Sequence, residues 1–396
     1  MAAKVTFFQV GTGDMSLVRL ADTSVTTILI DCRIRAGADD PGDEMPDVAR
    51  ALRERLQWDA KDRPFVNAFL LSHPDLDHCA GFGKHFWLGK PEDYPDDKLD
   101  RWERRIMIRE LWSSPLVFRR RSKNHLLSKD AQAFNTEARR RVKHWRDYGC
   151  AGDGNRILVM GEDVKGKTDD LSQILIKAGQ TFSTIAGESL SGFFTSQLLA
   201  PAPHEDDAEL EEELTKNESS VIMNMQISAS MYSFSKTKFL VGGDAEVLIW
   251  ERMWRRYQYT PEVLAYDLLL APHHCSWHSL SHDSWSKKGE NAKVSQDARN
   301  GLGQARSGAT IVSSSVTILD DDKDPPCIRA KREYEDILED VDGWFTCTGD
   351  LGKKPCMDLE VLSDGKVRRL AAAAALAGTV PSSVAASIPP RAGSGE

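Results

Sequence analysis

The sequence of 396 residues has no stretch that is long and apolar enough to cross a membrane. Its N-terminus, MAAKVTFFQVGTGD, lacks the charged and then apolar layout of a secretory signal peptide. The seven cysteines are scattered and include no C-x-x-C pair, which argues against a disulfide framework. From these absences we expect a cytoplasmic protein that does not enter a membrane.

An excess of positive charge is also absent, because the formal net charge is -9. A protein that coats nucleic acid electrostatically is therefore not indicated, although a locally basic groove stays possible. The apolar and charged fractions, 41% and 28%, are those of an ordinary globular protein. A chain of this length can bury a large core, in one domain or in two.

Strand and helix signals alternate in two separate parts of the chain, which predicts the α/β class. KVTFFQV, MSLVRLA and VTTILIDC have strand character, and MPDVARALRERLQW and FVNAFLLS follow as helix and strand. Strand signals return from Phe193. We expect a first half of a sheet domain over 1–81, a mainly helical insertion over 82–190, a second half over 191–368 and a disordered, low-complexity tail over 369–396.

The segment LLSHPDLDHCAG, which comes at the end of an apolar strand, contains four potential metal ligands. They are His73, Asp75, Asp77 and His78. A loop with this spacing can turn several imidazole and carboxylate groups towards one point, and Zn²⁺, Mn²⁺ and Fe²⁺ bind such groups. The alternative is a polar turn, since Asp and Pro are common in turns.

Two further apolar strands end in residues of the same kind. FLVGGDAE supplies Asp244, and LLLAPHHCSWHS supplies His273, His274 and His278. Each has an ordinary explanation by itself, a Gly-Asp turn or a structural histidine pair. Three strand ends of this type in one chain favour a metal site.

The segment SHPDLDHCAG resembles the T/S-H-x-H-x-D-H-x-x-G signature of the metallo-β-lactamase fold, with Asp75 in the place of the second histidine. Together with VGTGDMSLVRL, ILIDC, NESSVIMNM, VGGDAE and APHHCS, it is similar to the metallohydrolase domain of the ComEC/Rec2 competence proteins and their soluble relatives. The resemblance covers about residues 4–81 and 196–360. It implies an αββα sandwich of two mixed sheets flanked by helices.

The resemblance also implies a dinuclear site that holds two divalent ions, Zn²⁺ or Mn²⁺. His73 and Asp75 would face one ion, Asp77 and His78 the other, and Asp244 would bridge both. His274 aligns better than His273 with a family ligand, although the choice between them stays open. Asp77 would orient the attacking water, and His273 is a second catalytic candidate. Further possible site residues are Asn217 where the family has a histidine, Asp14, His278 and, if its loop folds inward, His204.

Such a site implies a hydrolase, most simply a phosphodiesterase or nuclease acting on nucleic acid or a nucleotide. Basic runs at 118–125 and 138–146, with Trp112 and Trp145 nearby, would attract phosphate and stack bases. A solvated helical face balanced by acids explains these runs equally well. An amide, ester or lactone hydrolase, or peptidase, is the second interpretation. The third is a non-catalytic module that binds protein partners through the insertion.

Overall fold

The computed structural model describes residues 2–38, 40, 42, 45–120, 126–201, 203, 211, 214 and 217–370. The expected tail lies outside this part of the chain from residue 371 onward, and so does His204. Within it, no helix combines the length and the apolar character that a membrane span requires.

Two mixed sheets form the centre of the molecule. In the first sheet the strand order is β19-β18-β1-β2-β3-β5-β6-β7-β8, and β4 pairs antiparallel with the first two residues of β5. Its strands are β1 (Lys4–Phe8), β2 (Ser16–Arg19), β3 (Thr27–Ile30), β4 (Gln57–Trp58), β5 (Pro64–Leu70), β6 (Met107–Ser113), β7 (Arg156–Met160), β8 (Leu175–Ile176), β18 (Cys356–Val361) and β19 (Val367–Arg369). The strands from β3 to β8 run parallel, and the others pair antiparallel.

The second sheet has the order β17-β16-β15-β14-β13-β12-β9. Its strands are β9 (Thr181–Phe182), β12 (Phe194–Ala200), β13 (Ile222–Ser228), β14 (Lys236–Val241), β15 (Tyr266–Leu270), β16 (Ala305–Ser313) and β17 (Trp344–Cys347). The strands from β14 to β17 run parallel, and those from β9 to β14 pair antiparallel. A small hairpin, β10 (Thr184–Ile185) with β11 (Glu188–Ser189), stands apart from both sheets.

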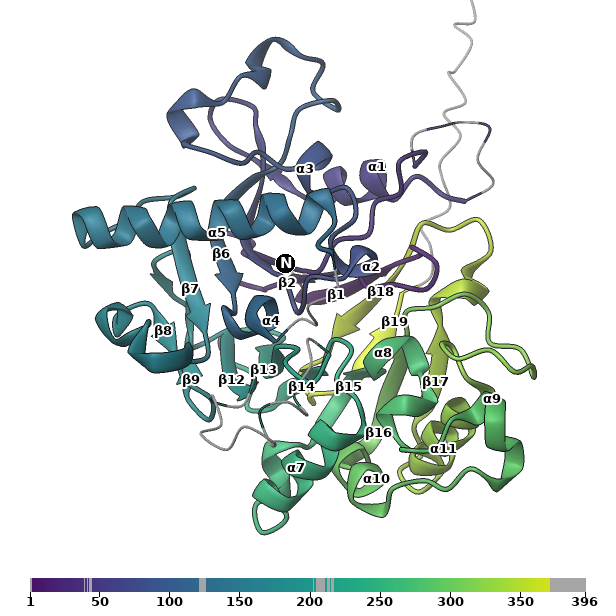
Figure 1. The fold of residues 1–396 in the computed structure, drawn as a ribbon. Helices are drawn as coiled ribbons and strands as arrows, with labels where there is room; N and C mark the ends of the chain where they lie inside the picture. The colour runs from purple at the N-terminus through teal and green to yellow at the C-terminus, as the bar shows by residue number, and fades with distance from the viewer. Residues whose placement is uncertain are drawn as a thin grey trace, which may run out of the picture.

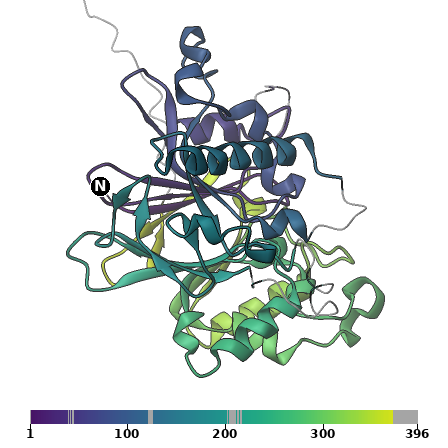
Figure 2. The ribbon, with the colours of Figure 1, turned by 60° about the vertical axis from the view of Figure 1, so that its left-hand side comes forward.

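Helices cover the outer face of each sheet, so the molecule has four layers (Figures 1 and 2). The helices along the first half are α1 (Val48–Arg53), α2 (Leu76–Cys79), α3 (Phe82–His85), α4 (Leu116–Arg119) and α5 (Lys129–Tyr148). Those along the second are α7 (Val247–Tyr257), α8 (Pro272–Cys275), α9 (Trp285–Lys288), α10 (Gln296–Leu302) and α11 (Ile328–Glu339). The mixed α/β class expected from the sequence is confirmed at this level.

Three large buried clusters hold the layers together. One lies between the two sheets, where Phe7 of β1 meets Phe239 of β14 edge to face with ring centroids 5.8 Å apart. The second lies under α1, α3 and α5, and the third packs Trp250 of α7 and Tyr334 of α11 against the second sheet. Because each sheet buries both faces, central strands such as β3, β5 and β15 are buried along their whole length.

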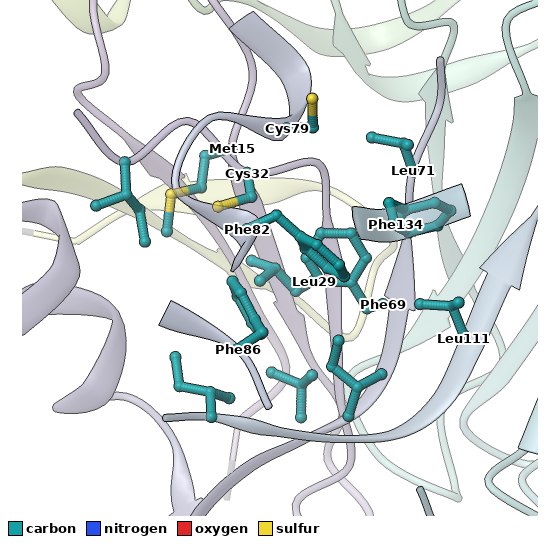
Figure 3. Close-up of a cluster of buried hydrophobic side chains, with 14 of the residues drawn as sticks. Met15, Leu29, Cys32, Phe69, Leu71, Cys79, Phe82, Phe86, Leu111 and Phe134 are labelled. Carbon is teal, nitrogen blue, oxygen red and sulfur yellow. The ribbon is translucent and has the colours of Figure 1, made fainter. Parts of the chain in front are cut away.

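The cluster under α5 also supports the loop that carries the histidines. Figure 3 shows Phe69 of β5 packed among the rings of Phe82, Phe86 and Phe134. Cys79, the last residue of α2, lies at the edge of the same cluster. Helix α2 and the loop before it therefore rest on a fully buried aromatic core.

The expectation of a mainly helical insertion over 82–190 is wrong for much of that segment, because β6, β7 and β8 continue the first sheet. The two charged residues of β6, Arg109 and Glu110, do not mark a helix face. Instead, Arg109 lies over the ring of Phe65 at 3.6 Å, and the buried Glu110 accepts a hydrogen bond of 2.7 Å from Trp112 Nε1. Helix α5 is present as expected, capped by Ser128 and ended by Gly149.

Candidate metal centre

The loop from Ser72 to Cys79 is tied by its backbone to both sheets. Asp14 N donates to Asp77 O at 3.1 Å, and Cys32 N donates to His78 O at 2.8 Å. From the second sheet, Val221 N donates to Ser72 O at 3.0 Å. The loop follows β5, and these bonds hold it at the edge where the two sheets meet.

The second histidine-bearing turn has an unusual backbone. In Pro272–Cys275, His273, His274 and Cys275 have φ values of 49°, 55° and 68°. A residue with a side chain in the left-handed region costs on the order of 1–3 kcal/mol, and such residues concentrate at functional sites. Since His273 N donates to Gly243 O at 3.0 Å, the turn is held against the loop that carries Asp244.

Asp244 lies at the centre of four imidazoles. Its Oδ1 is 2.9 Å from His78 Nε2 and 3.5 Å from His274 Nε2. Its Oδ2 is 3.4 Å from His73 Nε2 and 3.7 Å from His273 Nε2. Each carboxylate oxygen thus faces its own pair of histidines, and the side chain of Asp244 is almost fully buried.

Two further carboxylates fix the outer nitrogens of two of these rings. His78 Nδ1 lies 2.8 Å from Asp31 Oδ2, and His274 Nδ1 lies 3.2 Å from Asp14 Oδ1. A carboxylate accepts the ring N–H, so each Nδ1 carries a proton and each Nε2 is the atom left for a metal ion or, without metal, for a second proton. These two Nε2 atoms lie 3.2 Å apart, next to Asp244 Oδ1.

The charges of the cluster shift its pKa values strongly. Burial alone would lower the pKa of His274, but the carboxylates of Asp244 and Asp14 raise it to about 10. Burial is likewise outweighed at His78, whose pKa the carboxylates of Asp244 and Asp31 raise. Conversely, burial would raise the pKa of Asp244, yet the surrounding imidazoles depress it. Without a metal, the histidines of the cluster therefore hold extra protons, because the carboxylates favour positive charge at this place.

The buried group of Asp14, His78, Asp244 and His274 fits a metal ion. Each residue offers one ligand atom, and these atoms all lie within 4.8 Å of one another. The donor set, imidazole nitrogen with carboxylate oxygen, is one that divalent transition ions bind. In addition, the buried Nε2 of His73 has no hydrogen-bond partner in the part of the chain that the structure describes.

The structure brings most of the expected site residues to this place. Asp75 Oδ2 lies 3.7 Å from His73 Nε2, on the Oδ2 side of Asp244. Asp77 Oδ2 lies 3.4 Å from His274 Nε2, on the Oδ1 side, and its side chain is 36% exposed. Asp77 is therefore the member of the cluster that faces outward. Which of these residues bind a metal stays a prediction.

Two of the further candidates are placed differently. Asn217 Nδ2 donates to Glu246 Oε1 at 3.1 Å, and that oxygen lies 3.7 Å from His273 Nδ1. Asn217 therefore reaches the cluster through Glu246. His278 is half exposed and has its Nε2 3.9 Å from Asp324 Oδ2, beside the turn rather than among the imidazoles. A loop direction of this kind is not encoded in residue spacing.

Sequence reasoning missed three residues that support the cluster. Asp31 accepts from both the backbone N and the hydroxyl of Ser72, at 2.7 and 2.6 Å, and from His78 Nδ1. Glu246 sits behind His273, and Asp324 accepts from Ser276 Oγ and Trp277 N at 2.6 and 3.0 Å. Only Asp31 had a signal, an aspartate directly after the apolar strand TILI.

The two cysteines beside the histidines are buried thiols. Cys79 Sγ donates to Asp75 O at 3.0 Å, and burial raises the pKa of Cys79 to about 12. Burial also raises the pKa of Cys275, and the Sγ of Cys275 lies 4.0 Å from Cys327 O. Both residues therefore pack as small apolar groups and do not act as thiolates.

The basic run on α5 is largely neutralised by acids. Arg140 and Arg141 pair with Glu137, Lys143 pairs with Asp147, and Arg146 pairs with Asp170. A groove of about 1080 Å³ beside this helix contains both signs of charge.

Most of the other run, residues 121–125, lies outside the described residues. The expectation that Trp112 offers a stacking surface is wrong, because its ring is fully buried against Phe182 and Phe194. Trp145 is partly buried against the core under α5.

Comparison with known proteins adds no assignment to this geometry. No family model matches the chain, and a search of curated proteins finds no match either. The strand-end cluster and its position where the two sheets meet therefore remain the basis for assigning a function.

Proposed function

We propose that the chain is a metal-dependent hydrolase of the metallo-β-lactamase fold, which acts as a phosphodiesterase. The four-layer arrangement, with helices outside two mixed sheets, supports this fold. Support also comes from the position of the cluster, where loops following β5, β14 and β15 converge.

The observation that carries the proposal is the convergence of lone pairs around Asp244 Oδ1. The Nδ1 atoms of His78 and His274 donate to carboxylates, so their Nε2 atoms, which face each other at 3.2 Å, become acceptors once the extra protons of the metal-free cluster are displaced. Acceptors that converge in a buried place repel each other unless a cation or a proton lies between them. A divalent cation satisfies all of these groups at once.

Two ions fit better than one, because the two oxygens of Asp244 face different partners. His73, His273 and Asp75 gather on the Oδ2 side. His78, His274 and Asp77 gather on the Oδ1 side. Several of the ligands are carboxylates, which are hard oxygen donors. Mn²⁺ therefore suits this site as well as Zn²⁺ does.

When bound, such ions supply a hydroxide at neutral pH and stabilise negative charge that develops on the substrate. Asp77, the exposed carboxylate of the cluster, is placed to orient the attacking water and to accept its proton. Its pKa lies well below the ordinary value, because the hydrogen bond from His274 and the charges of His274 and His78 outweigh the effect of burial. Asp77 is therefore ionised at neutral pH. On the other side of Asp244, His273 has Glu246 Oε1 3.7 Å from its Nδ1 and is the second candidate for proton transfer.

The charges along α5 bear on the substrate class. The paired charges along α5 do not provide the continuous basic track that a long nucleic acid needs. We therefore favour a nucleotide or another small phosphodiester over an extended duplex.

The test is hydrolysis of bis-p-nitrophenyl phosphate by protein loaded with Mn²⁺ or Zn²⁺, compared with p-nitrophenyl acetate and a lactone. We expect turnover of the diester and a loss of at least about 100-fold in kcat for Asp77→Ala. Asp336→Ala is the matched control, since Asp336 is an exposed carboxylate of α11 paired with Arg299.

Turnover of the ester or lactone alone, with loss of that activity in Asp77→Ala, would replace the phosphodiesterase by an acyl hydrolase on the same site. Absence of turnover on every substrate, in protein shown to carry metal, would contradict the enzymatic proposal. A binding module would then be the remaining interpretation.

A further inference from the structure

Arg33 lies on a segment that runs alongside the histidine loop. Its neighbours Cys32 and Ile34 donate backbone hydrogen bonds of 2.8 and 2.9 Å to His78 O and Ala80 O. The chain before and after Arg33 is thereby locked to α2. The arginine side chain thus starts from a fixed backbone directly beside the cluster.

The side chain of Arg33 lies across the Gly-Thr-Gly turn that precedes Asp14. A Cβ atom at Gly13 would lie 2.3 Å from Arg33 Cδ and 2.7 Å from Arg33 Nη1. At Gly11 the same distance to Nη1 would be 4.0 Å. Gly13 is therefore required for the guanidinium to occupy this place, which gives the turn a role in shaping the site.

The guanidinium of Arg33 has no partner of its own. Its Nη1 is buried without a hydrogen bond, and within the described part of the chain Arg33 forms neither a hydrogen bond nor an ion pair. The fully buried Arg141, by contrast, donates to Glu137 and to two carbonyl oxygens. A partly buried guanidinium without a partner is unfavourable unless an anion accepts its hydrogen bonds and balances its charge.

The surroundings of Arg33 place its positive charge next to the outward face of the cluster. Burial lowers the pKa of Arg33, while the charges of Asp77 and Asp14 act in the opposite direction. A guanidinium stays protonated under such conditions and offers five N–H donors in a planar fork. Neither Asp77 nor Asp14 takes up these donors, so they are available to a bound molecule.

We propose that Arg33 binds an anionic oxygen of the substrate, a non-bridging oxygen of a phosphoryl group, beside the metal centre. The inference rests on the proposed hydrolase function and adds a substrate-binding residue to it. A planar fork of donors matches phosphate oxygens in two-point contact. Gly11, in the turn that Arg33 crosses, also lines a cavity of about 340 Å³.

The test compares wild-type protein with Arg33→Met, Arg33→Lys and the control Arg101→Met, which removes an exposed arginine paired with Asp62. Metal content and thermal unfolding are measured first, and we expect all variants to match the wild type in both. Binding of inorganic phosphate to the metal-loaded proteins is then measured by calorimetry. We expect Arg33→Met to weaken it about 10- to 100-fold and Arg33→Lys to weaken it less.

Kinetics provide the second measurement. For bis-p-nitrophenyl phosphate, we expect Arg33→Met to raise KM by about 10-fold or more, with a smaller change in kcat. For a neutral ester the same variant should behave as the wild type. The control Arg101→Met should leave KM and kcat unchanged for both substrates.

The outcomes separate this inference from the proposed function. If the wild type cleaves the diester but Arg33→Met leaves phosphate affinity and KM unchanged, the assignment of Arg33 is wrong and the hydrolase proposal stands. If no diester is cleaved but phosphate binding depends on Arg33, the assignment of Arg33 stands and the phosphodiesterase proposal fails. Should Arg33→Met not fold, Arg33→Lys decides, because equal phosphate affinity in that variant contradicts recognition by a planar fork.

Discussion

In each of the two sheets, three antiparallel strands are followed by parallel ones: β1, β2 and β3 before β5, and β12, β13 and β14 before β15. An aspartate follows the third strand in both, Asp31 after β3 and Asp244 after β14. A histidine stands three residues after the next strand in both, His73 after Leu70 and His273 after Leu270. The two sheets thus present the same residue types at corresponding strand ends.

The two aspartates nevertheless have different surroundings. Asp31 is saturated by Ser72 and by His78 Nδ1, so it orients a ring from behind. Asp244 faces the ring nitrogens of four histidines and lies at the centre of the cluster. The Gly-Gly pair before it explains this difference. Gly243 has a φ of 50°, and a Cβ there would lie 2.9 Å from Ser72 Cβ, so only glycine lets the chain carry Asp244 past Ser72.

The variant Asp244→Asn tests the central position of Asp244 and should have the most severe effect. The change removes the negative charge that both groups of histidines share, and we expect the protein to lose its bound metal and all hydrolytic activity. Metal analysis after gel filtration measures the first effect. Full metal content in Asp244→Asn would show that the two oxygens of this residue do not join two sites.

The extent of the first sheet can be tested with two tryptophans. Trp112 of β6 is fully buried between the sheets, whereas Trp145 of α5 is only partly buried. We expect Trp112→Ala to reduce the free energy of unfolding by about 3–5 kcal/mol and Trp145→Ala to reduce it much less. Urea denaturation measures both. Equal, small losses would support the detachable insertion that the sequence suggested.

A milder change is expected from Asp31→Asn. The amide can still contact Ser72, but it is a weaker acceptor for His78 Nδ1–H, so the ring is held less firmly. We expect metal affinity to fall about 10- to 100-fold, which is typical for a partner behind a ligating histidine. Competition with a chromogenic chelator measures it. An affinity equal to that of the wild type would mean that Asp31 is only a structural residue.

The smallest expected effect is a pH dependence of the metal-free protein. The pKa of His274 is raised to about 10, so its stabilising contribution is complete below the ordinary value of about 6.5. The contribution is lost as the pH rises through about 10, and we expect stability in EDTA to fall between about pH 7 and 10. Urea titrations at three pH values measure the slope, and His274→Gln should flatten it. An unchanged slope in that variant would assign the effect to another group.

Much of the second sheet follows from the sequence because its signals are local. Strand signals were expected to return from Phe193, and β12, β13, β14 and β15 lie in this part of the chain, with the amphipathic segment VLIWERMWRRY forming the helix α7. The first sheet was harder, since β6 contains Arg109 and Glu110. Arg109 lies over the ring of Phe65, a neighbour distant in the chain that no local pattern reveals.

The same limit applies to the site. Residues at strand ends were predictable, because parallel strands bring their carboxyl ends to one edge. The placement of Asn217 and His278 was not, since it depends on the direction in which each loop leaves its strand. Arg33 carries no motif at all. Its importance appears only when the side chain is seen unpaired beside Asp77 and Asp14.

The most direct test of the central claim is the metal content of purified protein, measured by plasma mass spectrometry for wild type, His274→Gln and His278→Gln. The two histidines are four residues apart, but only His274 lies in the cluster. We predict about two divalent ions per chain in the wild type and in His278→Gln, and at least one fewer in His274→Gln. A wild-type protein that contains no metal and takes up neither Zn²⁺ nor Mn²⁺ on dialysis would contradict the account.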